Sequence, residues 1–407
     1  MNFLLSAKGE DVTAWRAVED FVAAYRQTLL DLAASDRSGS SESVILEKCT
    51  VLEEAITTHR NIIERLNNLI EQVASAPAKE LTVAFYSDLY RHFGQFHSAP
   101  VFYQMSMSFL RQTSAAVVTQ ATAQLGLPAG HLPELAMIAV GAAGRCEYSP
   151  FSPLQVLLVH GEATASQLRN IQVVCQLIHA GFESAGLAID PEITPRNTIW
   201  RGTIAEWSQR CEDGLHSQAD EETINLWRLI DQYPLYPGEG FGRELKQISS
   251  DALNGSRPAL ANLIERMTSL SNGLGFMGRL KLERSGNARG LFRLLDYGLL
   301  PLSAALSALA LIKKSPAVST CDRINDLLRR RELDVDLAER MLATWYYLHD
   351  LRLRQEQSFR IDDRSSRSSF LNPDELTFDQ RQSLKQNLEA VAFILRHVEI
   401  IFSGMGE

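Results

Sequence analysis

Residues 140–159 read VGAAGRCEYSPFSPLQVLLV, and this stretch decides how the chain folds. Apolar residues 135–140 enter a turn of small residues, and apolar residues 154–159 leave it, a pattern typical of two strands joined by a glycine turn. Gly141 and Gly144 allow backbone N–H groups to approach a phosphate closely, and Arg145 adds a guanidinium beside them. The stretch therefore predicts a strand, an anion-binding turn and a second strand.

The longer pattern resembles the core of the nucleotidyltransferase superfamily, as found in PII-uridylyltransferases and in nucleotidyltransferase-like proteins of bacterial signal transduction. Those families read roughly G-[GS]-x-G-R-x-E-x-x-P-x-S-D-x-D before an apolar strand. The chain matches this pattern at Gly141, Gly144, Arg145, Glu147, Pro150 and Ser152. The resemblance implies that the nucleotide-binding positions are Gly141, Ala142, Gly144, Arg145 and Ser152, with Ala142 where the family often has a small hydroxyl residue.

Both aspartates of the family pattern are missing. Pro153 and Gln155 stand at the two acidic positions. In the family these aspartates hold Mg²⁺ ions, which neutralise the triphosphate and activate the attacking hydroxyl. Proline has no side-chain ligand, and a glutamine amide supplies only a neutral oxygen. We therefore expect no catalytic residue, no metal site and no cofactor. The alternative is an active enzyme that uses ATP or UTP with Mg²⁺.

A third carboxylate completes the metal site in the family, and either Asp190 or Asp231 is a candidate for it. One carboxylate alone leaves a hard dication coordinated mostly by water. Asp231 also begins a segment that resembles the family's D-x-R-x-x-x-G-D, with Tyr233 in place of arginine and Glu239 one residue late. The loss of the family's chemistry thus extends over more than one motif.

The length and composition of the chain limit its number of domains, its binding partners and its location in the cell. The 407 residues, of which 45% are hydrophobic, are enough for two or three domains. A net charge of -9 argues against general nucleic-acid binding. Five separated cysteines without a C-x-x-C spacing favour a reducing cytoplasm. The amino terminus lacks a signal-peptide pattern, and residues 298–312 fall short of the roughly 20 residues needed to span a bilayer, so we expect a cytoplasmic protein without a membrane partner.

The amino-terminal region shows helical periodicity in two segments, residues 10–34 and 45–73. The second repeats apolar positions with heptad spacing, as in a coiled coil, at Ile45, Cys49, Leu52, Ile56, His59, Ile63, Leu66, Ile70 and Val73. The two helices could pair as an antiparallel hairpin within one chain, or they could expose a seam for a second subunit or a protein partner. A lone histidine on an apolar face is usually a core residue, and we assign His59 to the core.

Helices are also expected over residues 79–93 and 101–125, before the predicted sheet, and from residue 241 to the carboxyl end. Within and after the sheet the expected helices span residues 163–185, 203–211, 241–252, 258–271, 288–313, 320–330, 335–358 and 377–402. Residues 278–284 read as a strand or an extended connector. We expect Arg196 and Arg201 to form salt bridges with nearby carboxylates, and the cluster Arg329–Arg331 to lie at a helix end.

The predicted fold is α+β and mostly α, with a small mixed-sheet core between two helical regions. The predicted domains are an amino-terminal helical region (residues 1–130), a nucleotidyltransferase-like core (131–240) and a carboxyl-terminal helical domain (241–407). Residues 294–302, 319–324 and 351–355 resemble the substrate-binding helical domain that follows the core in the same families, so the resemblance spans roughly residues 80–403.

Three functions remain open from the sequence. The first is an inactive nucleotidyltransferase scaffold that works in regulation, as a dimer or by binding a nucleotide or a protein partner. The second is an active Mg²⁺-dependent protein nucleotidyltransferase. The third is a structural helical adaptor without a ligand. The missing aspartates at positions 153 and 155 favour the first over the second.

Overall fold

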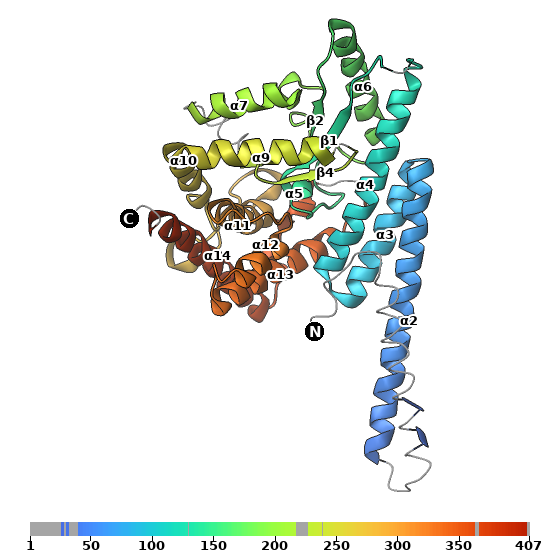
Figure 1. Cartoon of the computed structure of the whole chain (residues 1–407). Coiled ribbons are helices and arrows are strands. Elements are labelled where there is room, and N and C mark those ends of the chain that lie inside the picture. The colour runs from blue at the N-terminus through green and yellow to red at the C-terminus, as the bar shows by residue number, and fades with distance from the viewer. Residues whose placement is uncertain are drawn as a thin grey trace. The chain divides into compact units, whose positions relative to one another are not determined.

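The computed structural model describes residues 26–27, 30–31, 40–128, 130–216, 227–237, 239–362 and 366–404. The chain divides into two compact units, Met1–Glu71 and Gln72–Glu407. Most of the helix predicted over residues 10–34 lies outside the described residues. The mostly helical architecture with a small mixed sheet confirms the predicted fold class (Figure 1). The domain boundaries near residues 130 and 240 stay predictions.

The first unit contains most of helix α2 (Ser40–Ser75), which confirms the helix predicted from the heptad spacing. Cys49, Ile56 and His59 are buried, and burial lowers the pKa of His59, as expected for a core histidine. Arg26 donates a hydrogen bond to Glu53 of α2 over 2.9 Å, so an ion pair joins the first predicted helical segment to the second.

The second unit begins with α3 (Lys79–Phe96) and α4 (Ala99–Gln124), close to their predicted bounds. His97 ends α3 in the left-handed conformation, and the Ser98 hydroxyl caps α4 by accepting from the Val101 N–H. The two helices pack through stacked aromatic rings, with the ring centroids of Phe85 and Phe109 4.1 Å apart. These apolar residues form a core, as the sequence predicted.

The sheet has the strand order β3-β2-β1-β4, with β1 (Leu135–Val140), β2 (Val156–His160), β3 (Arg201–Gly202) and β4 (Gln232–Pro234). Strand β1 pairs antiparallel with β2 and β4, and β2 pairs parallel with β3. The neighbouring β1 and β2 confirm the strand, turn and strand predicted from residues 135–159. All residues of β1 and β2 are buried, because helices of the second unit cover the sheet. These helices are α6 (Ala165–Ser184), α7 (Ile204–His216) and α9 (Glu239–Gly255).

The carboxyl-terminal helices are α10 (Arg257–Thr268), α11 (Leu300–Ile312), α12 (Thr320–Arg329), α13 (Val335–Gln357) and α14 (Phe378–Gly404). The helix predicted from residue 288 is wrong at its start. Gly290 has a φ of 84°, and residues 292–293 form strand β5 (Phe292–Arg293), which pairs with β6 (Phe370–Leu371). The Arg329–Arg331 cluster lies at the end of α12, as predicted.

One segment among the described residues, Leu295–Ile312, is long and apolar enough to cross a membrane by length and composition. It joins a π-helical turn (Leu295–Leu299) to α11, so it is longer than the segment apparent from the sequence. It is 78% buried inside the protein, and α10, α12 and α14 pack around α11. A helix that is apolar on all sides is expected at the centre of such a bundle.

Candidate functional site

The glycine turn after β1 forms the short helix α5 (Gly141–Gly144). Gly141 has a φ of 64°, and a Cβ atom there would lie 2.5 Å from the Gln155 side-chain oxygen. A Cβ atom on Gly144 would overlap the Asp231 carbonyl, because the chain entering β4 passes directly against the turn. Close packing within the protein thus accounts for both glycines.

The backbone N–H groups that follow the turn are already engaged. The Arg145 N–H donates to the Gly141 carbonyl over 3.0 Å, and the Glu147 N–H donates to the Ala142 carbonyl over 2.8 Å. The Cys146 N–H donates to Ala143, and Cys146 itself has a φ of 61°. Because these N–H groups form hydrogen bonds to carbonyls of the turn, they cannot donate to a phosphate unless the turn changes conformation.

Arg145 points into the protein and binds two carboxylates. Its Nε donates to Glu147 over 3.0 Å and its Nη1 donates to Asp231 over 2.7 Å. The Arg145 side chain is 13% exposed. The guanidinium of Arg145 therefore faces carboxylates of the protein itself.

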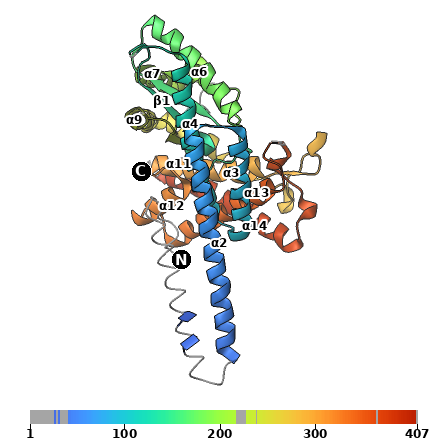
Figure 2. The same cartoon turned by 90° about the vertical axis from the view of Figure 1, so that its right-hand side faces the viewer.

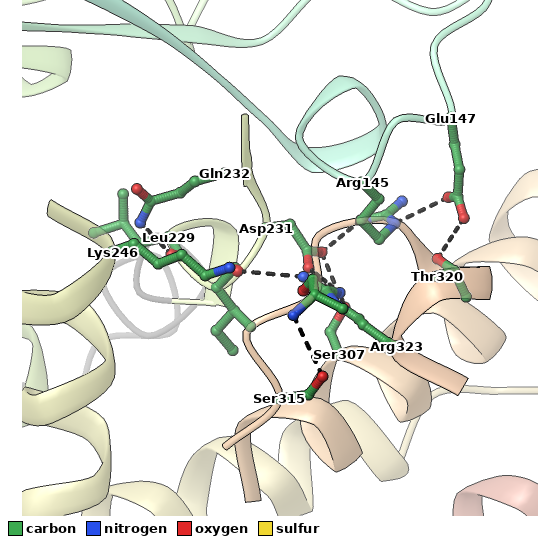
Figure 3. Close-up of polar contacts among 12 residues, drawn as sticks. Arg145, Glu147, Leu229, Asp231, Gln232, Lys246, Ser307, Ser315, Thr320 and Arg323 are labelled. Atoms are coloured by element: carbon green, nitrogen blue, oxygen red, sulfur yellow. Dashed lines mark hydrogen bonds and ion pairs between the residues drawn. The ribbon is translucent and has the colours of Figure 1, made fainter. Parts of the chain in front are cut away.

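Asp231 joins the core to the carboxyl-terminal helices (Figure 3). Its two carboxylate oxygens accept from Arg145, from Arg323 Nη1 of α12 over 2.6 Å and from Ser307 of α11 over 2.8 Å. The side chains of Asp231 and Arg323 are only 2% and 3% exposed. We call Arg145, Glu147, Asp231, Ser307 and Arg323 the core ion network.

Glu147 links the core ion network to α12 and α13. It accepts hydrogen bonds from the Thr320 hydroxyl of α12 and from Trp345 Nε1 of α13, at 2.5 and 2.8 Å. Burial alone would raise its pKa, but the Arg145 charge, His349 and these donors lower the pKa to about 2. Glu147 is therefore ionised throughout the physiological pH range.

A second buried cluster fixes Ser152, one of the predicted nucleotide-binding positions. The Ser152 hydroxyl accepts from Arg352 of α13 over 2.8 Å, and Arg352 Nε donates to Glu356 over 2.8 Å. Glu356 also accepts from the Tyr90 hydroxyl of α3 and from the Ser149 hydroxyl, at 2.7 and 2.9 Å. The segment after the turn is thus bonded to helices on both sides of it in the sequence.

His349 gives a test of this buried region. Burial lowers its pKa to about 3 despite Glu147 nearby, and its Nδ1 lies 2.7 Å from the Tyr103 hydroxyl. The folded protein therefore keeps His349 neutral, whereas the unfolded chain takes up a proton below its ordinary pKa of 6.5. Stability should fall as pH drops from 6.5 towards 3, by about 1.4 kcal/mol per pH unit at full slope.

Between pH 6.5 and 4.5 the difference between the wild type and His349→Gln reports on His349, because Glu147 titrates mainly at lower pH and His59, whose pKa burial also lowers, is present in both proteins. Urea unfolding across this window should show a loss of about 2 kcal/mol in the wild type and a flatter profile in His349→Gln. Equal slopes for both proteins would show that His349 does not titrate in this way.

The acidic positions of the family motif do not form a metal site. Gln155 donates from Nε2 to Asp190 over 2.9 Å and accepts from Arg228 Nη1 over 3.1 Å. The other Asp190 oxygen accepts the N–H groups of Glu192 and Ile193. Pro153 is exposed and has no ligand atom. No group of three or more His, Cys, Asp or Glu side chains that could hold a metal ion occurs in the part of the chain that the structure describes.

Magnesium therefore does not fit the residues at this place. A neutral amide, one carboxylate that already accepts three hydrogen bonds, and a guanidinium stand where the family has anionic ligands. The positive charge of Arg228 balances Asp190 and repels a dication. The other candidate carboxylate, Asp231, already accepts hydrogen bonds from Arg145 and Arg323.

The contacts of Arg201 differ from the salt bridge expected from the sequence. Arg201 donates to the Pro195 carbonyl over 2.9 Å instead of forming the expected salt bridge, because the loop folds its carbonyl groups over the guanidinium. Sequence reasoning missed Arg323, which binds Asp231, and Arg352, which binds Ser152. Their only sequence signal was the family resemblance of residues 319–324 and 351–355, which does not say what they contact.

Two protein-family models match the chain. Residues 87–221 match the model described as "putative nucleotidyltransferase DUF294", and residues 257–400 match that of the "putative nucleotidyltransferase substrate binding domain". No curated protein matches the chain.

The first match covers the predicted core motif and the sheet up to α7, and the second covers α10 to α14. The two matches and the turn therefore define a nucleotidyltransferase-like class of protein. The chain is a nucleotidyltransferase-like protein with the substrate-binding type of helical domain.

Proposed function

We propose that the chain is a catalytically inactive relative of the PII-uridylyltransferases that acts as a regulatory module. The observation that carries the proposal is the Gln155 side chain at an acidic position of the motif, bonded to both Asp190 and Arg228. Transfer of a nucleotidyl group requires the charge of the triphosphate to be neutralised by metal ions held on carboxylates. This place instead holds an amide and an internal cation.

Residual nucleotide binding at the turn would place a phosphate beside Arg145, the cation that the turn retains. A phosphate there competes with Glu147 and Asp231, which already neutralise this guanidinium at 3.0 and 2.7 Å. This observation favours a second candidate function, an adaptor in which the turn joins the core to the helical domain and takes no ligand. The two candidates share the absence of catalysis and differ in whether ATP or UTP binds.

Binding of Mn²⁺, followed by electron paramagnetic resonance, tests the metal-site part of the proposal. We expect the wild type to bind no Mn²⁺ specifically, with or without ATP. The variant Pro153→Asp with Gln155→Asp should gain binding, because it places two new carboxylates beside Asp190. Adding Arg228→Gln to that variant should tighten binding by about tenfold, since it removes the competing charge.

A control variant carries Arg228→Gln alone and should bind no Mn²⁺. Specific binding by the wild type as tight as that of the triple variant would contradict the proposal. It would instead favour the alternative, a Mg²⁺-dependent protein nucleotidyltransferase. Titration with ATP or UTP in EDTA separates the two inactive candidates, because only a metal-independent nucleotide-binding module would respond.

A further inference from the structure

Residues 273–292 form a finger that leaves the helical domain and returns to it. The Gly275 N–H donates to the Arg279 carbonyl over 2.7 Å and the Lys281 N–H donates to the Gly273 carbonyl over 2.8 Å, which closes a tight first loop. A second loop is closed by hydrogen bonds between Glu283 and residues 290–291. The finger carries the yellow-orange colour of its residue numbers on the right-hand side of Figure 2.

The base of the finger is anchored. Phe292 is fully buried, and a Cβ atom on Gly273 would meet the Phe292 and Tyr297 side chains. The Asn272 side chain donates to the Leu388 carbonyl of α14 over 3.0 Å. The backbone hydrogen bonds within the finger and the packing at its base therefore give it a defined conformation on the helical domain.

The tip of the finger presents two adjacent apolar side chains to solvent. Phe276 is 84% exposed and Met277 is 80% exposed. Met277 has a φ of 55°, an unfavourable conformation for a residue with a side chain, although glycines flank the pair on both sides. An unfavourable conformation that holds a large apolar side chain in water points to a use for that side chain.

The finger is basic although the chain is acidic. Residues 273–292 contain four arginines and lysines and one acidic residue, Glu283, which pairs with Arg293 just after the finger over 2.6 Å. The four basic residues of the finger are exposed and have no ion-pair partner among the described residues. They are Arg279, Lys281, Arg284 and Arg289. The surface around the tip thus attracts an anion.

We propose that the finger docks on an anionic lipid surface, with Phe276 and Met277 entering the headgroup region and the basic residues contacting lipid phosphates. Arg279 and Lys281 lie two and four residues after Met277, so even a fully extended chain of about 3.3 Å per residue would keep them within roughly 7 and 13 Å of it, close to the headgroups that the tip enters. The net charge of -9 opposes the approach only weakly, because salt screens charges beyond about 10 Å.

The size and shape of the tip favour a membrane over a protein partner. A stable protein interface buries about 800 Å² on each side, or some 20 residues, whereas two side chains on a convex loop bury far less. A bilayer adapts to a small convex tip, and apolar insertion together with basic contacts supplies the two signals that peripheral binding needs. This inference changes the expectation of no membrane partner, which rested on the lack of a spanning segment; a two-residue tip leaves no such signal.

Flotation of the full chain with vesicles tests the proposal. The protein should bind vesicles of phosphatidylcholine mixed with phosphatidylglycerol and not vesicles of phosphatidylcholine alone. Phe276→Ser with Met277→Ser should weaken binding by about a hundredfold, since burial of each side chain contributes roughly tenfold. Arg279→Gln with Lys281→Gln should weaken it by about 25-fold, because each basic residue near an anionic surface contributes about fivefold.

A matched control variant carries Val335→Ser and Phe378→Ser, at two other exposed apolar positions (67% and 80% exposed). It should bind vesicles as the wild type does. A cooperative thermal unfolding transition, measured for each variant, serves as the check that the variant is folded. Three results would overturn the proposal: no binding to either kind of vesicle, binding that the tip variant keeps, or capture by heparin without capture by anionic vesicles. The last would instead identify a nucleic-acid-like polyanion as the partner.

Discussion

Replacing Asp231 with alanine is expected to lower the free energy of unfolding by about 3–5 kcal/mol. The reason is that Asp231 is the shared partner of two buried guanidinium groups, Arg145 and Arg323, at 2.7 and 2.6 Å. Without it, Arg323 remains buried with its charge uncompensated, Arg145 keeps only Glu147 as a partner, and Ser307 loses its acceptor. Urea unfolding at neutral pH, followed by circular dichroism, measures the change.

Asp296→Ala is the matched control. Asp296 also pairs with an arginine, Arg293, at 3.1 Å, but both side chains are about half exposed. Its removal should cost less than about 1 kcal/mol, because solvent screens exposed pairs. If the two variants lose similar amounts of stability, the core ion network does not hold the nucleotidyltransferase-like core to the helical domain as the structure implies.

The parts of the fold that were predictable are those governed by local pattern. The apolar runs before and after the glycine turn gave β1 and β2, because each run is short, bounded by turn residues and fully buried. The long helices α2, α4 and α13 were predictable from the helical spacing of their apolar residues. The start of the helix containing α11 was not, since Gly290 and the pairing of β5 with β6 override a helical apolar pattern.

The core ion network was not predictable from local pattern. Arg145 lies 86 positions from Asp231, and Asp231 lies 92 positions from Arg323. Charge and spacing do not specify which of the chain's many charged residues meet after folding. The motif singled out Arg145 but could not show whether its guanidinium faces a phosphate or a carboxylate.

The role of Arg228 was also hidden. The loss of the acidic pair at Pro153 and Gln155 was evident from the motif. That an arginine from outside the motif lies at 3.1 Å from Gln155, next to Asp190, required the structure. Because the charge of Arg228 opposes a metal ion at this place, two aspartates alone are not expected to restore the family's chemistry in full.

The most direct test of the central claim is Mg²⁺-dependent transfer of a labelled nucleotide by the purified wild-type chain. ATP and UTP are supplied in turn, with the chain itself, a PII-like protein and nucleic acid as acceptors, and an active PII-uridylyltransferase serves as the positive control. Loss of a single preorganised charge-stabilising group commonly slows such chemistry by about 100- to 1,000-fold, and here the metal-binding pair is replaced as a whole. We expect no transfer above the level of an EDTA-treated sample. Robust transfer that EDTA abolishes would contradict the account and identify the chain as an active nucleotidyltransferase.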